Sequence, residues 1–432
     1  MKYYSTKNKN TFYTLREAVL KGLPDDNGLF VPESIPVFSD DVLKSFPGKS
    51  VAETGLEVCR NLIESDIPSA ELESICSEAF NFPVPLTRLN EKTFVAELFH
   101  GPTLAFKDFG ARFMARIMSY LNKDEKKLLT ILVATSGDTG SAVADGFFGI
   151  EGIEVYILYP SGGVSDLQEK QLTTYGKNIH ALEIKGTFDD CQRIVKSAFL
   201  DKELSSTYRL TSANSINISR LIPQAVYYFT SWSAMPAKTE KIVFTVPSGN
   251  FGNLTAGLFA QRMGLPVSHF VAATNLNDIV PQYLHGKGFS PRPSIATISN
   301  AMDVGNPSNF GRMLELFDHS LEKMQKMISS FVISDDETKQ EMKKLYKTYG
   351  YIADPHGAVG LSAWEKYSES EPSATGIVLE TAHPAKFIDV VEDALSISVT
   401  LPPALDKLRS LKKSAQLLSA DFEEFKKYML SK

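Results

Sequence analysis

The sequence predicts an α/β fold in which two parallel-sheet α/β domains face each other across a cleft, preceded by a mostly helical N-terminal extension. Short apolar, β-branched runs such as residues 128–134 are typical of strands buried on both faces of a sheet. These runs alternate with helical stretches, and the alternation resumes at residue 242 after a break at 234–238. We therefore expect an extension over residues 1–95, a smaller mobile domain over 96–235 and a large domain over 236–432.

The N-terminal extension contains signals for helices and for one short strand. Residues 15–21 have the composition of a helix that Gly22 would end. A tight turn is predicted at residues 25–28, and the apolar run after it is a predicted strand that stops at Pro32. Two further helices are expected at about residues 50–65 and 68–79.

In the two domains the expected strands and helices follow each other regularly. For the smaller domain we predict strands at residues 128–134, 153–159, 179–184 and 209–211, and helices at 141–148, 164–175, 188–204 and 219–232. For the large domain we predict strands at 242–246, 269–273, 331–333 and 376–380, a helix at 254–263, a long surface loop at 281–307 and a lysine-rich helical tail from residue 404.

The composition argues against nucleic acid and membrane partners and favours the cytoplasm. The chain has 432 residues, of which 43% are hydrophobic and 22% charged, and its formal net charge of −6 argues against a nucleic acid partner. No apolar run approaches the roughly 18 residues that span a bilayer, so we expect no membrane partner. Cys59, Cys76 and Cys191 are too few and too far apart for a disulfide framework or a metal site. These cysteines, and an N-terminus without a signal-peptide pattern, favour a cytoplasmic protein.

Lys107 lies in an unusually apolar stretch, between Phe106 and Phe109. Apolar surroundings disfavour the charged form of an amine, which lowers its pKa and prepares it for Schiff-base chemistry with a carbonyl cofactor. The alternative is a snorkelling lysine at the start of an amphipathic helix whose buried face is Phe106, Phe109 and Phe113. This stretch by itself favours the snorkelling lysine.

Two glycine-containing loops each join a predicted strand to a predicted helix. Residues 246–253 would direct several backbone N–H groups to one point beside a positive helix end, which suits a phosphate group as well as it suits a tight turn. Residues 134–141 have the same placement and suit a carboxylate or a phosphate. A helix cap formed by Asp138 or Thr139 explains the second loop equally well, and one loop can do both.

Two further clusters lie close to strand ends. Asn214, Ser215 and Arg220 offer donors suited to a phosphate monoester, or else helix caps and a surface ion pair. Thr381 and His383 follow the strand at 376–380, where open α/β sheets place ligands, although a structural role for His383 is the favoured alternative. Residues 354–357 are interpreted as a turn and helix cap without chemistry. With Lys107, these loops indicate a covalently bound, phosphorylated carbonyl cofactor and a second anionic ligand beside it.

The same stretches resemble the motifs of a known family. Residues 100–110, 135–140, 247–253 and 381–384 resemble, in that order, the threonine synthase family within the fold type II pyridoxal-phosphate enzymes. Residues 4–6 and 26–32 resemble the N-terminal domain of its bacterial and fungal branch. The resemblance covers nearly the whole chain. It implies a pyridoxal 5'-phosphate-dependent lyase that converts O-phospho-L-homoserine and water to L-threonine and phosphate in threonine biosynthesis, as a monomer or small homo-oligomer.

The resemblance also implies a role for each candidate residue. Lys107 would bind the cofactor as a Schiff base and carry protons, and Thr381 would bind the pyridine nitrogen through a neutral hydroxyl. The cofactor phosphate would be held by Gly249, Asn250, Phe251, Gly252 and Asn253. The substrate carboxylate would be held by Ser136, Gly137 and Thr139, and the substrate phosphate by Asn214, Ser215 and Arg220.

Asp138 departs from the pattern of many relatives, in which an asparagine donates to the 3-hydroxyl oxygen of the cofactor. An ionised carboxylate cannot donate a hydrogen bond. Threonine synthases of this branch are similar to this sequence in having aspartate there, so we assign Asp138 to cofactor binding and leave its contact open.

Two other functions stay open on the sequence. A serine or threonine dehydratase would use the same cofactor, but a substrate-phosphate site at residues 214–220 argues against it. A non-catalytic phosphoester-binding or regulatory protein would need no Schiff base at Lys107.

Overall fold

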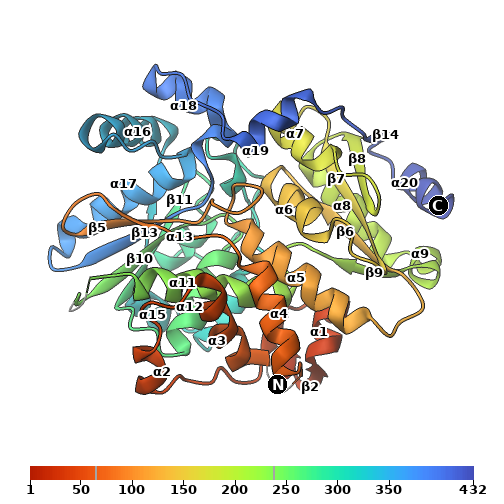
Figure 1. Cartoon of the computed structure of the whole chain (residues 1–432), viewed down its shortest axis with the longest axis horizontal. Helices are drawn as coiled ribbons and strands as arrows, with labels where there is room; N and C mark the ends of the chain where they lie inside the picture. Colours follow the sequence, from red (N-terminus) through yellow and green to blue (C-terminus); the bar gives the residue numbers. More distant parts are fainter. Residues whose placement is uncertain (64–65, 237–238) are drawn as a thin grey trace.

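The computed structural model describes residues 1–432 apart from 64–65 and 237–238. A six-stranded sheet lies on the left of Figure 1 and a five-stranded sheet on the right, with helix α5 (Lys107–Asn122) between them and the N-terminal helices below. The predicted fold class, two parallel-sheet α/β domains preceded by an N-terminal segment, is therefore confirmed.

The larger sheet has the strand order β12-β11-β10-β13-β5-β4, in which β4 runs antiparallel to β5 and the other pairs are parallel. Its strands are β4 (Leu86–Arg88), β5 (Thr93–Glu97), β10 (Ile242–Pro247), β11 (His269–Thr274), β12 (Ile328–Val332) and β13 (Thr375–Glu380). Its helices are α12 (Gly252–Arg262), α13 (Ile279–Leu284), α14 (Phe310–Leu316), α15 (Leu321–Met327), α16 (Asp335–Tyr349), α17 (Pro355–Ser370) and α18 (Ile388–Leu395), with the 3-10 turns η2 (Asn300–Met302) and η3 (Pro384–Phe387).

The smaller sheet has the order β14-β8-β7-β6-β9, and all its neighbouring strands are parallel. Its strands are β6 (Leu129–Ala134), β7 (Ile153–Pro160), β8 (Ile179–Lys185), β9 (Arg209–Ser212) and β14 (Gln416–Ser419). The helices of this half are α6 (Asp138–Phe147), α7 (Asp166–Thr173), α8 (Phe188–Leu200), α9 (Lys202–Thr207) and α20 (Phe422–Leu430). The link to the larger sheet contains α10 (Ile218–Leu221), η1 (Ile222–Gln224) and α11 (Ala225–Ser233), and the C-terminal link contains α19 (Pro403–Asp406) and η4 (Lys407–Ser410).

The N-terminal segment contains an antiparallel three-stranded sheet as well as the expected helices. It consists of β1 (Lys2–Ser5), β2 (Asn8–Thr14), β3 (Phe30–Pro32), α1 (Leu15–Lys21), α2 (Asp40–Lys44), α3 (Val51–Ile63) and α4 (Ser69–Ala79). Strand β2 escaped prediction because it is polar and almost wholly exposed, and β1 because it is only four residues long. Gly22 ends α1 as predicted, with φ of 76° and an N–H bond to Ala18 O. The last residues of the helix predicted to 65, and part of the break at 234–238, lie outside the described residues.

The strand pairing corrects two of the predicted domain boundaries. Strand β5 pairs with β13, so residues 86–97 belong to the larger sheet and the extension ends before them. Strand β14 pairs with β8, and α20 packs on α8, so the C-terminal end joins the smaller domain. The tail was predicted as helix throughout because β14 is four residues long and half exposed, without the apolar run of a buried strand.

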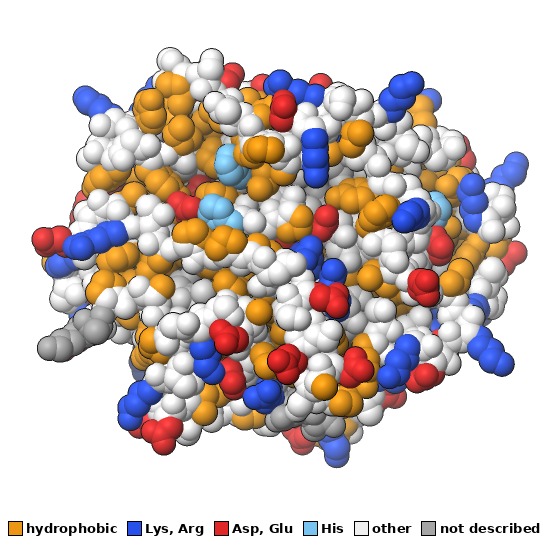
Figure 2. All heavy atoms as spheres, viewed as in Figure 1, with side chains coloured by type: hydrophobic (Ala, Val, Ile, Leu, Met, Phe, Trp, Pro, Cys, Tyr) orange, Lys and Arg blue, Asp and Glu red, His pale blue; other side chains and the backbone are white. Residues whose placement is uncertain are grey.

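The surface carries mixed charges. Lysine, arginine, aspartate and glutamate side chains are interspersed on the face drawn in Figure 2. Within the described part of the chain, every helix is too short or too polar to cross a bilayer.

Candidate active site

Lys107 opens helix α5 and lines a cavity between the two halves of the molecule. The residues just before it pair with the segment that follows strand β13. The Phe106 N–H donates to Thr381 O (2.9 Å), and the His383 N–H donates to Leu104 O (3.0 Å). Lys107 and Thr381, which are far apart in the sequence, are thereby fixed next to each other.

The surroundings of Lys107 favour its neutral, reactive form. Burial lowers the pKa of the Lys107 amine from its ordinary value. The negative charge of Asp138 opposes this shift, whereas the positive charges of Arg220 and Lys386 add to it. The predicted apolar environment is present as well, since Phe109 and Phe113 are fully buried on the same helix.

Ten of the predicted site residues line one cavity. They are Lys107, Thr139, Ser215, Arg220, Gly249, Asn250, Phe251, Gly252, Asn253 and Thr381. The remaining four, Ser136, Gly137, Asp138 and Asn214, are not among the residues that line this cavity. These residues follow strands of both sheets: Lys107 follows β5, Thr139 follows β6, Ser215 and Arg220 follow β9, residues 249–253 follow β10, and Thr381 follows β13.

The loop between β10 and α12 has the geometry of an anion cradle. The N–H groups of the first residues of α12 have no acceptor within the helix. Phe251 adopts a left-handed conformation (φ 58°) that turns the chain into the helix. A Cβ at Gly249 would lie 2.8 Å from Met302 Cα, so a larger residue does not fit. The Asn253 side chain holds the loop by donating to Pro247 O (2.7 Å).

Arg220 is a buried cation beside the cavity. Burial lowers the pKa of its guanidinium to about 10, which leaves it charged at neutral pH. Its Nη1 donates to Ala213 O (2.7 Å), while its buried Nε has no hydrogen-bond partner. No carboxylate among the described residues forms an ion pair with it. Gly110 of α5 permits this packing, because a Cβ there would lie 2.9 Å from Arg220 Nε.

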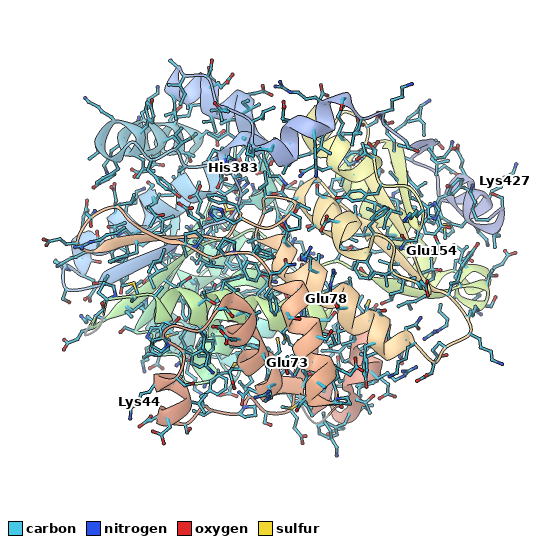
Figure 3. All side chains as sticks on the ribbon, in the orientation of Figure 1. Lys44, Glu73, Glu78, Glu154, His383 and Lys427 are labelled. Carbon is cyan, nitrogen blue, oxygen red and sulfur yellow. The ribbon has the colours of Figure 1, made fainter. Side chains whose placement is uncertain are left out.

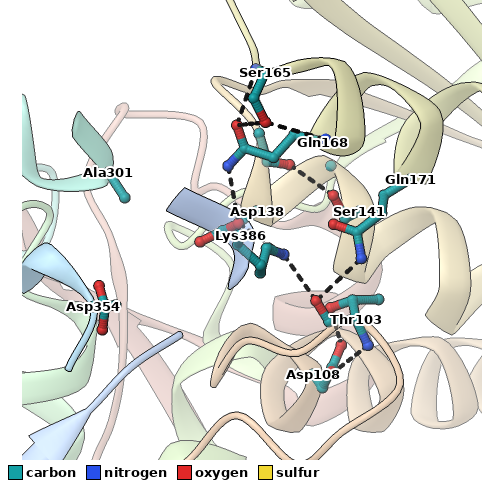
Figure 4. A network of polar contacts seen from close by, with 12 residues as sticks. Thr103, Asp108, Asp138, Ser141, Ser165, Gln168, Gln171, Ala301, Asp354 and Lys386 are labelled. Atoms are coloured by element: carbon teal, nitrogen blue, oxygen red, sulfur yellow. Dashed lines mark hydrogen bonds and ion pairs between the residues drawn. The ribbon is translucent and has the colours of Figure 1, made fainter. Parts of the chain in front are cut away.

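Asp138, at the start of α6, forms an ion pair that the sequence did not reveal. Asp138 accepts from Lys386 Nζ (2.9 Å) and from Gln168 Nε2 (3.2 Å), as Figure 4 shows. Burial by itself would raise the pKa of Asp138, but the charges of Lys386 and Lys107 hold that pKa well below its usual range. Asp138 is therefore an ionised acceptor. In the same loop Ser136 is exposed, and Gly137 (φ 137°) packs against Gln168.

Asn214 supports the site from behind. Its Nδ2 donates to Ala134 O (3.0 Å), and its Oδ1 accepts from Ser212 Oγ (3.2 Å), so it joins the ends of β6 and β9. It lines an adjoining cavity that it shares with Ser215 and Asn250. Ser215 and Asn250 also line the main cavity, so the two cavities meet at these residues.

Two histidines lie near the site, and they have different roles. His383, near the centre of Figure 3, caps η3 by accepting from the Ala385 N–H (3.1 Å), which is the structural role we favoured. Asp354 caps α17 as expected, but His356 also lines the main cavity. His356 Nδ1 bonds Asp354 Oδ1 (2.5 Å) and Nε2 accepts from the Ala301 N–H (3.1 Å). His356 thereby holds Ala301, whose carbonyl oxygen would lie 3.2 Å from a Cβ at Gly249.

Lys386, His356 and Gln224 are the polar groups at this site that the sequence interpretation missed. Gln224 lines the cavity and donates to Arg220 O (2.7 Å). Lys386 lies within the stretch that follows Thr381, but its burial and its partner gave no sequence signal. Its ammonium group is fully buried and committed to Asp138, whereas Lys107 lines the cavity.

These residues fit a phosphorylated carbonyl cofactor. The amine at Lys107 has a lowered pKa, residues 249–253 line the cavity at the start of α12, and Thr381 supplies a buried hydroxyl. The sequence profile described as "Pyridoxal-phosphate dependent enzyme" matches residues 80–379. Fold and site thus define an enzyme of the pyridoxal-phosphate-dependent class, and its cofactor is pyridoxal 5'-phosphate.

The two ends of the chain narrow this class. The profiles "Threonine synthase N terminus" and "Threonine synthase, C-terminal" match residues 2–80 and 357–429. The chain belongs to the threonine synthase family.

Relatives match over their full length. The threonine synthase of Haemophilus influenzae is 45% identical over 432 residues, covering 100% of both chains. The crystal structure of threonine synthase from Escherichia coli superposes with a TM-score of 0.93 at 43% identity, and 100% of each chain is covered. A pyridoxal-phosphate-bound threonine synthase from Brucella melitensis gives a TM-score of 0.93 at 36% identity, covering 99% of this chain and 98% of that one.

Proposed function

We propose that this chain converts O-phospho-L-homoserine and water to L-threonine and inorganic phosphate. The observation that carries the proposal is that one cavity is lined by both the loop that opens α12 and the buried guanidinium of Arg220, whose Nε has no hydrogen-bond partner among the described residues. The Gly249 cradle suits the phosphate of the cofactor, and Arg220 supplies a buried positive charge for a second phosphate. A dehydratase acting on serine or threonine would have no use for the second site.

The cofactor supplies one element of this chemistry. When bound, it stabilises negative charge that develops on the substrate carbons next to the amine. Lys107 would hold its carbonyl carbon, residues 249–253 its phosphate, and the Thr381 hydroxyl its ring nitrogen.

Lys107 is the proposed proton carrier of the reaction. Its Nζ would remove the proton from substrate Cα and then move protons at Cβ and Cγ while phosphate leaves Cγ and water adds to Cβ. A base that acts several times works best with a pKa near the working pH. Burial, with Arg220 and Lys386 nearby, lowers the pKa of Lys107 in that direction.

The substrate would be held at its two charged ends. Residues 136–139 lie at the start of α6, where backbone N–H groups and the helix dipole attract a carboxylate. Arg220 and Ser215 would bind the phosphate ester, with Asn214 fixing the backbone behind them. We further propose a cytoplasmic protein, monomeric or a small homo-oligomer, a compartment supported by the three buried, unpaired cysteines.

Product analysis tests this proposal. The holoenzyme is incubated with O-phospho-L-homoserine, L-homoserine, L-threonine or L-serine, and phosphate, threonine and 2-oxo acids are measured. We expect equal amounts of phosphate and threonine from the phosphorylated substrate, and none with Lys107→Ala. Formation of 2-oxo acids from threonine or serine, without threonine from the phosphorylated substrate, would replace the proposal with a dehydratase.

A further inference from the structure

A second lysine, Lys386, is buried beside the proposed catalytic one. It lies on η3, the turn that follows Thr381, and its side chain has 0% exposure. Its ammonium group donates to Thr103 O (2.8 Å) and pairs with Asp138 Oδ1 (2.9 Å). Thr103 belongs to the loop that leads into Lys107, and Asp138 opens helix α6. One buried cation thus joins three segments that are remote in the sequence (Figure 4).

The same two acceptor atoms are also held from helix α7. Gln168 Nε2 donates to Asp138 Oδ1 (3.2 Å), and Gln171 Nε2 donates to Thr103 O (3.2 Å). Residues three apart share one face of a helix, so both contacts come from the same side of α7. Each acceptor therefore receives one bond from Lys386 and one from α7.

The loop before Lys107 is restrained from its other side by Asp108. The carboxyl group of Asp108 accepts from the Thr103 N–H (2.9 Å) and bonds the Thr103 hydroxyl (2.6 Å). All three polar groups of Thr103 are therefore bonded to buried side chains. The two contacts of Lys386 therefore go to atoms that neighbouring buried side chains also restrain.

We propose that Lys386 is a positioning residue for Lys107: its buried ammonium group holds the Thr103 carbonyl and the Asp138 carboxylate in one fixed arrangement beside the catalytic amine. The inference rests on the proposed function, in which Lys107 carries the cofactor. Lys386 itself touches neither substrate nor cofactor in this account.

The arrangement has an electrostatic consequence for Lys107. The positive charge of Lys386 lowers the pKa of Lys107, and the negative charge of Asp138 raises it. While the two are paired their effects oppose each other. Removing either partner leaves the other acting alone on Lys107. Among the described residues, Arg220 on α10, Asp108 on α5, His356 on α17 and His383 before η3 also interact electrostatically with these three residues. Glu169, Asp389, Arg409 and Lys413 line a surface cavity together with Lys386.

The test measures the amine of Lys107 without turnover. Apoenzyme captures pyridoxal phosphate through the neutral amine, so the pH dependence of the capture rate reports the pKa of Lys107. We expect Lys386→Met to move the midpoint of this profile up by about one pH unit and Asp138→Asn to move it down by a similar amount. The double variant lacks both charges, so its midpoint should lie between those of the single variants. Lys386→Arg should keep the wild-type midpoint.

A matched control replaces a lysine in an exposed ion pair. Lys339 on α16 pairs with Asp393 on α18 (2.7 Å), and Lys339→Met should leave the midpoint unchanged. Shifts of the two single variants in the same direction, or no shift in either, would overturn the proposal. If Lys386→Met does not fold, the proposal is tested with Asp138→Asn and the double variant, because removing both partners of a buried pair is tolerated better than removing one. The capture midpoint of Asp138→Asn should then lie below that of the double variant. Capture by Lys107→Ala would instead refute the proposed function.

Discussion

Replacing Gly110 by alanine tests how closely helix α5 packs on Arg220. A Cβ at this position would lie 2.9 Å from Arg220 Nε and 2.9 Å from its backbone oxygen, which cannot rotate away. Helix propensity alone would favour alanine by about 1 kcal/mol, whereas overpacking typically costs about 1–3 kcal/mol. We expect a net loss of about 1 kcal/mol in stability, and a displaced Arg220 that raises KM for the phosphorylated substrate about tenfold.

Gly311 offers the matched control. It is also helical, but a Cβ there would meet nothing nearer than Leu29 Cδ1 at 4.0 Å. Gly311→Ala should therefore raise the free energy of unfolding by about 1 kcal/mol and leave KM unchanged. Urea unfolding midpoints and steady-state kinetics of both variants give the comparison. If Gly110→Ala matched Gly311→Ala in stability and in KM, the close packing of α5 on Arg220 would be refuted.

Three further predictions concern the anion sites and a buried carboxyl. Arg220→Lys loses the forked guanidinium and should raise KM about 10- to 100-fold with a smaller change in kcat; an unchanged KM would remove Arg220 from the phosphate site. Gly249→Ala should weaken cofactor binding, because its Cβ would meet Met302 Cα at 2.8 Å. Fluorescence titration of the apoenzyme measures this affinity, and a wild-type value would show that the loop at Gly249 does not bind the cofactor phosphate. Burial raises the pKa of Asp108 to about 7 from 3.8, so the folded state keeps a proton that the unfolded state releases, and wild-type stability falls as pH rises through this window. Asp108→Asn should remove that fall. Measured by urea unfolding, its stability relative to the wild type should therefore increase by about 2–4 kcal/mol as the pH rises from about 4 to about 8. Parallel pH profiles of the two proteins would contradict the raised pKa of Asp108.

The sequence predicted the sheets where strands are buried on both faces. Strands such as β6 and β10 are continuous apolar runs, so their positions agree with the structure to within a residue or two. Because ligand loops follow the carboxyl ends of such strands, the loops at 134–141 and 246–253 could be assigned as well. Strand β14 gave no such signal, because its pairing with β8 depends on a contact between distant segments.

The polar support of the site could not be predicted in the same way. Lys386 is one lysine among many in the sequence, and its partner Thr103 lies 283 residues away. His356 was correctly placed beside a helix cap, but its contact with the Ala301 N–H depends on how α17 packs against η2. For Asn214 the amide type predicted a ligand contact, and the hydrogen bonds by which it also joins β9 to β6 gave no sequence signal.

The central claim is that Lys107, and not the buried Lys386, binds the cofactor. Reduction of the holoenzyme with borohydride, followed by mass analysis of its peptides, tests this most directly. The account predicts a single pyridoxyl label on Lys107 and no label in Lys107→Ala. A label on Lys386, or a holoenzyme in which neither lysine is labelled, would contradict it.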